Sequence, residues 1–467
     1  MRRICPRIVV AAALAVLLAA SGCTPSDEDD AFRPGSADVG DPYVPGYGNG
    51  GYDVAHYALD VRYDPATDRL TGRAVLTATA TQGLSRFNLD LAGLDIDRVT
   101  VDGATAKHRR TGNELVVEPA RGVPRGARFT VEVAYAGVPA PVTDGPLGSG
   151  GFLHTDDGAI ALGQPDSAAT WFPVNDHPSD KATYDIAVSV PDGLAALSNG
   201  VPGPKRSDGG WTTWRWSERS PMASYLTTLV IGDYRVTTGT HEGRPIVTAV
   251  PSGEPPNGPA ATSLARTGEI VDFLAGRFGP YPFEAYGGVA VADDRIGYAL
   301  ETQSRPVYGP GFFADGRPNL NVVAHELAHQ WFGDSVSLSR WSDIWLNEGF
   351  ATYAEWLWEE HDGGQSVQRA FEARYATTDW TRPSVDPGRE AMFGSAVYLR
   401  GALAVHALRR TVGDDAFFRI LRQWTTERRD RNGTTADLVA LAERISGRQL
   451  RSLMDAWLTG GSAPALP

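Results

Sequence analysis

The sequence contains 467 residues, of which 42% are hydrophobic and 21% charged, and its formal net charge is −13. This length suggests two or three domains rather than one, and the composition is that of a folded globular protein rather than a disordered chain. The negative charge argues against a nucleic-acid partner, because phosphate contacts need clustered Lys and Arg, and no basic stripe occurs after the first seven residues.

Residues 1–22 have the pattern of a secretory signal peptide. Three arginines lie among the first seven residues, and an apolar run follows that is too short to span a bilayer comfortably. The run ends in Ala-Ser-Gly-Cys, which resembles the lipobox of bacterial lipoproteins and makes Cys23 the expected lipidation site. We therefore expect an extracytoplasmic protein, held by a lipid anchor at the outer face of the cell membrane. A secreted protein with an ordinary cleaved signal is the alternative.

The chain has two cysteines, Cys5 and Cys23. Cys5 leaves with the signal peptide and Cys23 is the expected lipid attachment point, so the mature protein has no free thiol. Disulfides then contribute nothing to stability, and any metal site must use histidines and carboxylates.

Residues 23–50 contain mostly Pro, Gly, Ser and acidic residues and show no apolar periodicity. A segment of this composition buries too little apolar surface to fold. We therefore expect a disordered tether between the membrane and the first domain.

Short strands are predicted from residue 51 to residue 245. In residues 57–63 and 70–78, apolar positions alternate with polar ones on either side of a Pro-Ala-Thr-Asp turn, as in a hairpin with one buried face. Similar short segments recur, separated by Gly and Pro. This pattern predicts an extended, mostly antiparallel β domain over residues 51–245.

The pattern becomes mainly helical over residues 246–467. Apolar residues recur at helical spacing from Leu264 to Phe278, and Gly279-Pro280 ends that helix. Further helices are predicted around residues 319–333, 346–361, 395–411, 414–426, 435–445 and 448–458. The predicted fold class is therefore α+β and multidomain, with an antiparallel β domain followed by a mainly α domain.

Residues 321–334 read NVVAHELAHQWFGD and contain the first chemical motif. His325 and His329 are four residues apart, so both imidazoles face the same side of a helix and can bind one zinc ion. Glu326 lies beside the first histidine, within reach of a metal-bound water as general base. A catalytic zinc has three protein ligands and one open position, so a third ligand is needed.

Glu348 is the candidate third ligand. It lies nineteen residues after His329 in an aromatic-rich helical segment, residues 341–361, and completes a two-His, one-Glu set of the catalytic type. Glu355 is about two turns further along the same face, where its carboxylate can accept the second N–H of a ligand histidine. An ordinary helix with two surface histidines is the alternative for HExxH alone, and the second segment makes that alternative poor.

The segments HELAHQWFGD and WSDIWLNEGFA resemble the aminopeptidase N family of gluzincins, which includes the leukotriene hydrolases. The similarity extends from about residue 52 to about residue 460. It implies a saddle-like β domain, a thermolysin-like catalytic domain and one Zn²⁺ per chain. It also implies a zinc-dependent aminopeptidase that hydrolyses the N-terminal peptide bond through a zinc-activated water.

The resemblance also implies residues that bind the substrate. Family members carry a Gly-Ala-Met-Glu-Asn loop whose Glu binds the free α-amino group, and residues 297–302 here read Gly-Tyr-Ala-Leu-Glu-Thr. Gly297 and Glu301 match this pattern, whereas positions 300 and 302 depart from it. Gln164 corresponds to a family Gln that helps to bind the substrate N-terminus, although His177 stands where the family often has Glu.

Tyr398 corresponds to the family tyrosine that donates a hydrogen bond to the oxyanion of the tetrahedral intermediate. Gly401 and Ala402 match the flanking pattern, and Arg400 replaces the family's Lys. In the mechanism that the resemblance implies, Glu326 takes a proton from the water and passes it to the leaving amine, while zinc and Tyr398 stabilise the oxyanion.

Larger relatives add a C-terminal helical domain that closes the cleft, whereas about 120 residues follow Glu348 here, so we expect a more open cleft. We expect a monomer whose partners are peptides with a free N-terminus and the membrane. Two alternatives stay open: a zinc endopeptidase, which would leave Glu301 and Gln164 without a clear purpose, and a non-catalytic surface binding protein with a decayed site. Similar ligand sets also accept cobalt or manganese.

Overall fold

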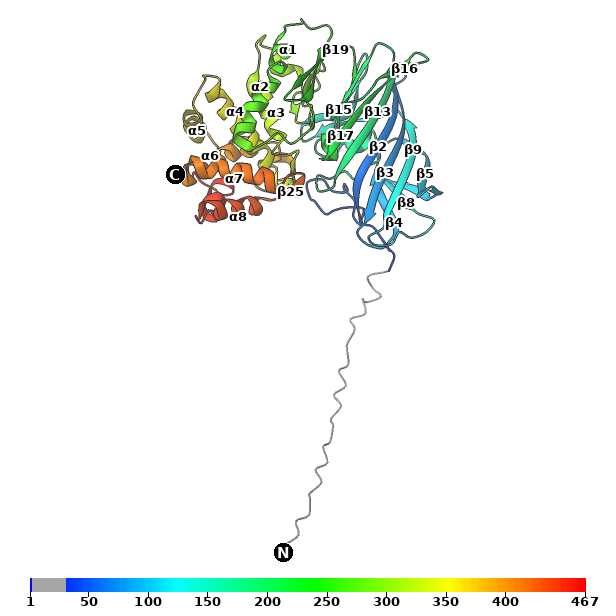
Figure 1. Ribbon diagram of the computed structural model, residues 1–467, viewed down its shortest axis with the longest axis horizontal. Coiled ribbons are helices and arrows are strands. Elements are labelled where there is room, and N and C mark those ends of the chain that lie inside the picture. The colour runs from blue at the N-terminus through cyan, green and yellow to red at the C-terminus, as the bar shows by residue number, and fades with distance from the viewer. Residues whose placement is uncertain (2–30) are drawn as a thin grey trace.

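A computed structural model describes residue 1 and residues 31–467 of the chain. The expected signal peptide, apart from its first residue, and the candidate lipidation site Cys23 lie outside the described residues. Figure 1 shows a β-rich half beside a helical half, and this arrangement confirms the predicted α+β fold class. Among the described residues, no helix has the length and apolar character needed to cross a bilayer.

The β-rich half is built on one large sheet with the strand order β15-β17-β13-β2-β3-β9-β5-β6, and β16 pairs with β17. Neighbours are antiparallel except for β13 and β2, which run parallel. The strands are β2 (Tyr52–Asp64), β3 (Arg69–Ala80), β5 (Asp95–Val101), β6 (Ala104–Thr105), β9 (Arg128–Gly137), β13 (Lys181–Pro191), β15 (Val201–Pro202), β16 (Arg206–Asp208) and β17 (Trp211–Ala223).

The β2–β3 hairpin explains why the alternating sequence forms this sheet. Tyr57 faces Leu76 across the two strands and Leu59 faces Ala74, and all four side chains are buried. Because successive side chains point to opposite faces of a strand, the apolar positions form the core face and the polar positions stay outside. The predicted hairpin is therefore confirmed.

Two smaller sheets complete this half. One has the order β1-β4-β8-β7 and the other the order β10-β11-β12-β18-β14. Their strands are β1 (Arg33–Pro34), β4 (Leu84–Asp90), β7 (Lys107–Thr111), β8 (Glu114–Glu118), β10 (Pro141–Gly145), β11 (Gly148–His154), β12 (Ala159–Leu162), β14 (Ala195–Ser198) and β18 (Leu229–Gly232).

The second half combines a sheet of order β19-β20-β21-β23-β22 with the helices, and β24 pairs with β25. The strands are β19 (Tyr234–His241), β20 (Arg244–Pro251), β21 (Tyr286–Ala290), β22 (Ala299–Leu300), β23 (Val307–Tyr308), β24 (Val336–Leu338) and β25 (Arg431–Gly433). The helices are α1 (Pro259–Leu264), α2 (Thr267–Phe278), α3 (Leu320–His329), α4 (Trp345–His361), α5 (Val367–Tyr375), α6 (Gly401–Val412), α7 (Asp414–Glu427), α8 (Thr435–Ser446) and α9 (Arg451–Leu458).

The domain boundary differs from the one expected at residue 245. Strand β20 pairs with β19 on one side and, in parallel, with β21 of the catalytic half on the other. The expected boundary would cut this hairpin, whose sheet belongs to the second half. An alternating sequence pattern predicts a strand but not the sheet that the strand joins. The boundary near residue 232 therefore follows only from the pairing of β20 with β19 and β21.

The disordered tether expected over residues 23–50 is wrong for its described part, residues 31–50. Strand β1 pairs with β4, and the side chains of Tyr43 and Val44 are buried. The Tyr43 hydroxyl donates to Asp386 at 2.8 Å and accepts from the backbone N–H of Gly388 at 2.8 Å, so the segment connects the two halves. A few buried side chains and specific hydrogen bonds order this segment. Such contacts produce no periodic pattern in the sequence, so the order could not be predicted from it.

Asp41 holds the same segment to both halves. One of its carboxylate oxygens lies 3.2 Å from His177 Nε2 and accepts the backbone N–H of Trp341 at 2.9 Å. Burial alone would raise the pKa of Asp41, but the hydrogen bonds from His177 and from the backbone outweigh burial and hold that pKa below its usual value. The ionised carboxylate therefore stabilises the native fold.

We predict that Asp41→Ala lowers the free energy of unfolding by about 3 kcal/mol at pH 7, because it leaves a buried imidazole and a buried N–H without their acceptor. Urea titration measures this loss. Because the folded-state pKa of Asp41 is lowered, its contribution is present above the unfolded pKa of about 3.9 and is lost as the pH falls through the folded value. Asp97→Ala, at an exposed position, is the control, and an equal loss in both variants would contradict the assignment.

Candidate metal centre

Helix α3 carries both candidate histidine ligands. Asn319 caps its N-terminus, with the side-chain oxygen accepting the backbone N–H of Val322 at 3.2 Å. His325 and His329 lie one turn apart on the buried face, with exposed fractions of 8% and 1%. The i, i+4 spacing thus places both imidazoles against the neighbouring helix α4.

Glu348, in the first turn of α4, completes the cluster. Its Oε2 atom lies 3.3 Å from His325 Nε2 and 3.4 Å from His329 Nε2. The ligand atoms of these three residues all lie within 4.8 Å of one another. Two imidazole nitrogens and one carboxylate oxygen converging in this way fit a tetrahedral zinc ion with one position left open.

Hydrogen bonds at the far side of each ring fix the orientation of the two imidazoles. His325 Nδ1 lies 2.6 Å from Glu355 Oε1, and His329 Nδ1 lies 3.0 Å from the carbonyl oxygen of Phe332. A carboxylate and a carbonyl accept hydrogen bonds, so each Nδ1 carries the proton and each Nε2 faces Glu348. The sequence does not predict the contact with the Phe332 carbonyl, because the position of this carbonyl depends on the turn at Gly333, whose φ is +127°.

The electrostatics of the cluster favour a cation. Burial would lower the pKa of His329, but the carboxylates of Glu348 and Glu301 raise it to about 9. The pKa of Glu326 is raised to about 8, and burial is the largest cause. The imidazoles of His325 and His329 oppose this increase, whereas the carboxylates of Glu301 and Glu348 add to it. Three buried carboxyl groups around two imidazoles can all be ionised only beside added positive charge, which matches a divalent ion.

A cavity of about 460 Å³ opens onto this cluster. All candidate site residues predicted from the sequence line this cavity, apart from the lipidation site Cys23, which lies outside the described residues. Its lining consists of Leu147, Gln164, Gly297, Tyr298, Ala299, Glu301, Phe312, Asn319, Asn321, Val322, His325, Glu326, His329, Glu348, Glu355 and Tyr398.

Glu301 lines the same cavity, directly after the edge strand β22, with a carboxylate oxygen within 4.8 Å of ligand atoms of Glu326 and His329. Its Oε1 atom accepts hydrogen bonds from Gln164 Nε2 at 3.0 Å and from the Tyr225 hydroxyl at 3.1 Å. Burial raises the pKa of Glu301, and the nearby Glu348 carboxylate adds to this effect, whereas His329 opposes it. Sequence reasoning missed Tyr225, because a tyrosine at the end of a strand has no distinguishing pattern.

Tyr398 lies beside the cluster, in a π-helical turn (Ala396–Arg400) that leads into α6. Its ring stacks on His325 with a centroid distance of 6.0 Å. The close approach of α4 and α6 allows this contact: a Cβ atom at Gly349 would lie 2.9 Å from the Gly401 backbone. π-Helical turns often occur at functional sites.

Arg400 points away from the cavity. Its side chain is fully buried and donates to the carbonyl oxygens of Trp457 at 2.7 Å and Trp380 at 2.9 Å. The residue therefore anchors the C-terminal helix α9 rather than taking part in the cluster.

Comparison with known proteins gives a consistent result. Residues 54–226 match the peptidase M1 N-terminal domain and residues 263–457 match the peptidase family M1 domain. An M1 zinc metallopeptidase mutant from Deinococcus radiodurans, bound to a Tyr-Ser-Ala substrate, has a similar structure: the TM-score is 0.84 at 32% identity, covering 92% of this chain and 99% of that one.

Curated relatives are longer. "Probable aminopeptidase 1" of Sulfurisphaera tokodaii is 26% identical over an alignment of 406 residues, and the match covers 82% of this chain and 50% of that protein. "Aminopeptidase N" of Streptomyces lividans is 25% identical over an alignment of 448 residues, and the match covers 87% of this chain and 50% of that protein. The chain thus spans about half the length of these relatives.

We predict that Glu355→Gln lowers zinc affinity about 10- to 100-fold, because the charged acceptor that orients His325 is lost while the three ligands remain. Competition with a chromophoric chelator measures this change without any substrate. Glu360→Gln, at an exposed position on the same helix, is the control and keeps the wild-type affinity. Equal affinity in all three proteins would contradict a role for Glu355 in holding the imidazole.

Proposed function

Because this chain belongs to peptidase family M1, we propose that it is a zinc-dependent aminopeptidase that removes N-terminal residues from peptides. The observation that carries this proposal is the position of Glu301, a carboxylate in the same cavity as the two-His, one-Glu cluster. A free α-amino group is mostly protonated near neutral pH, with a pKa of about 8. Glu301 is therefore placed to bind this ammonium group beside the reacting carbonyl.

We assign one zinc ion per chain to His325, His329 and Glu348, since their ligand atoms converge and are buried. When bound, zinc supplies Lewis-acid chemistry: it polarises a carbonyl group and lowers the pKa of water. The remaining steps belong to the protein's own side chains.

Glu326 is the proposed general base and acid. It lines the cavity next to His325 and has a pKa of about 8, raised chiefly by burial, which suits proton transfer near neutral pH. Its carboxylate takes a proton from the attacking water and then gives it to the leaving amine. Tyr398 donates a hydrogen bond to the developing oxyanion and keeps its proton, since burial holds the pKa of this phenol far above its usual value.

The substrate N-terminus is held close to the metal cluster. Glu301 binds the ammonium group, Gln164 fixes Glu301, and Gly297 lines the cavity without a side chain, which leaves room for the peptide. The fixed distance from Glu301 to the metal cluster selects the first peptide bond. The Tyr-Ser-Ala ligand of the Deinococcus radiodurans enzyme, a tripeptide, supports the same substrate class.

The test is hydrolysis of a panel of aminoacyl p-nitroanilides, each with and without an N-acetyl group, by residues 24–467 loaded with zinc. The proposal predicts cleavage of the free-amine substrates alone and no cleavage by Glu326→Gln, which keeps the shape of the side chain and removes its basicity. Equal cleavage of acetylated substrates would instead identify an endopeptidase. Zinc binding without any cleavage would favour a binding protein.

Tyr398→Phe tests the oxyanion role. Loss of one preorganised donor lowers kcat about 100- to 1,000-fold, because the hydrogen bond forms in the transition state, while KM changes little. Steady-state kinetics on the best free-amine substrate measure both constants. A normal kcat would exclude Tyr398 from the oxyanion site.

We further propose that the protein acts as a monomer, attached to the outer face of the cell membrane through lipid on Cys23. The Ala-Ser-Gly-Cys sequence after a signal-like segment supports this proposal. In a bacterial host, labelled palmitate is expected to enter the wild-type protein and not Cys23→Ala, which should appear in the soluble fraction. Equal labelling of both proteins would refute lipidation at Cys23.

A further inference from the structure

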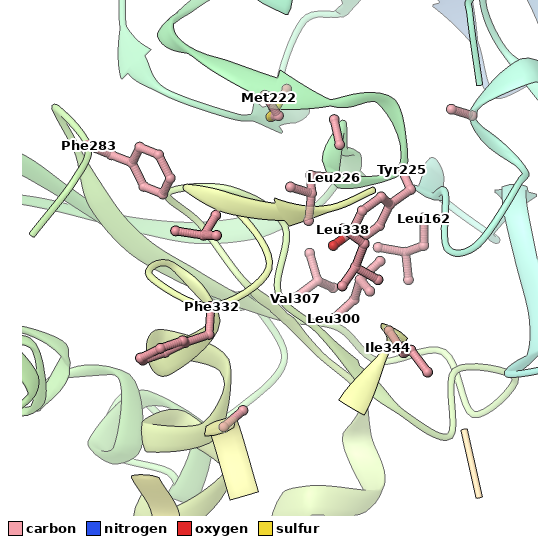
Figure 2. Close-up of a cluster of buried hydrophobic side chains, with 14 of the residues drawn as sticks. Leu162, Met222, Tyr225, Leu226, Phe283, Leu300, Val307, Phe332, Leu338 and Ile344 are labelled. Carbon is pink, nitrogen blue, oxygen red and sulfur yellow. The ribbon is translucent and has the colours of Figure 1, made fainter. Parts of the chain in front are cut away.

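Tyr225 occupies an unusual place for a polar group. It lies in a 3₁₀ turn (Ser224–Leu226) after β17 and is 1% exposed. Figure 2 shows its hydroxyl oxygen inside a cluster of apolar side chains that come from both halves of the molecule, including Leu162 and Leu338. Its ring also packs against Trp341 at a centroid distance of 5.2 Å. A hydroxyl buried among apolar groups is costly unless it has a hydrogen-bond partner.

The partners of this hydroxyl are the Glu301 carboxylate and the helix that carries Glu348. It donates to Glu301 Oε1 at 3.1 Å and accepts from Asn347 Nδ2 at 3.5 Å. Asn347 immediately precedes the candidate metal ligand Glu348. The single hydroxyl proton is therefore committed to Glu301, while the hydroxyl oxygen contacts the helix that carries the metal ligand.

Two donors converge on the same oxygen of Glu301. Gln164 Nε2 lies 3.0 Å from Oε1, so this atom accepts from both Gln164 and Tyr225. The last torsion of a glutamate side chain is otherwise broad, and two donors on one oxygen restrict it. The carboxylate is thereby held with Oε1 bonded to the protein, which leaves Oε2 as the oxygen to bind a ligand.

Tyr225 does not itself reach the ligand. Glu301 and Gln164 line the cavity, whereas Tyr225 is absent from its lining among the described residues. We propose that Tyr225 is a positioning residue for the substrate's α-amino group, which it serves by orienting the Glu301 carboxylate. This inference rests on the proposed aminopeptidase function.

Tyr225→Phe is the direct test, because the ring keeps its apolar contacts and only the hydroxyl is lost. For L-leucine p-nitroanilide we expect KM to rise about tenfold, as for loss of one hydrogen bond to a charged group, and kcat to stay within about twofold. Tyr308→Phe is the matched control. Tyr308 is buried on the strand that pairs with β22, and its hydroxyl has no hydrogen-bond partner in the described part of the chain.

A second readout does not depend on turnover. In the Glu326→Gln background loaded with zinc, calorimetric titration with L-leucinamide should show about tenfold weaker binding when Tyr225→Phe is added. In a Glu301→Gln background, Tyr225→Phe should have no additional effect on the affinity, because the oriented carboxylate is already gone.

The outcomes separate this inference from the proposed function. Unchanged KM and unchanged amide affinity in Tyr225→Phe, with or without a lower melting temperature, would overturn it and leave Tyr225 as a core residue. An additional loss of affinity from Tyr225→Phe in the Glu301→Gln background would also overturn it. If the wild-type enzyme cleaves acetylated substrates equally well, the proposed aminopeptidase function fails instead.

Discussion

The burial of three carboxyl groups, those of Glu301, Glu326 and Glu348, in one cavity is the constraint on which the rest of the site depends. All three side chains are at most 4% exposed, and they surround one cavity together with two imidazoles. Burying like charges together is costly in a medium of low dielectric constant, so the three groups can all be ionised only beside positive charge. The proposed divalent cation, at the two-His, one-Glu cluster, and a substrate ammonium group, at Glu301, are the positive charges that fit this arrangement.

The fold keeps these charges in place from several directions. Helices α3 and α4 bring the three ligand atoms together, and two glycines let α6 approach α4 closely enough for Tyr398 to stack on His325. Glu301 follows an edge strand of the catalytic sheet, yet both hydrogen bonds to its Oε1 atom come from residues of the β-rich half. The part of the site around Glu301 is therefore built across the junction of the two halves.

This junction has its own polar connections. Lys181, at the start of β13, donates to the backbone carbonyls of Asp334 at 2.7 Å and Ser335 at 2.8 Å, a few residues after the histidine motif. Asp41 and Tyr43 add further bonds between the N-terminal segment and the catalytic half. Because a shift of about 1 Å in a substrate-positioning group can cost about 100-fold in rate, contacts far from the metal matter for the proposed chemistry.

Local patterns in the sequence predict much of this architecture. The alternation in β2 and β3 and the apolar spacing of α2 are local features, and the metal cluster follows from a five-residue motif and one glutamate in the next aromatic-rich segment. Non-local features could not be predicted: the sheet that β20 joins, the ordering of residues 31–50 and the hydroxyl of Tyr225 beside Glu301. Helix α5 was also missed, because most of its side chains are polar and only Val367, Ala370 and Phe371 are buried.

The most direct test of the account is anomalous diffraction at the zinc absorption edge from crystals of Glu326→Gln soaked with zinc and L-leucinamide. The account predicts one zinc peak bounded by the Nε2 atoms of His325 and His329 and by the Glu348 carboxylate, with the ligand's amino group hydrogen-bonded to Glu301. A zinc peak elsewhere, or an amino group bound away from Glu301, would contradict the central claim that the buried carboxylates hold a metal ion and a substrate ammonium group next to each other in one cavity.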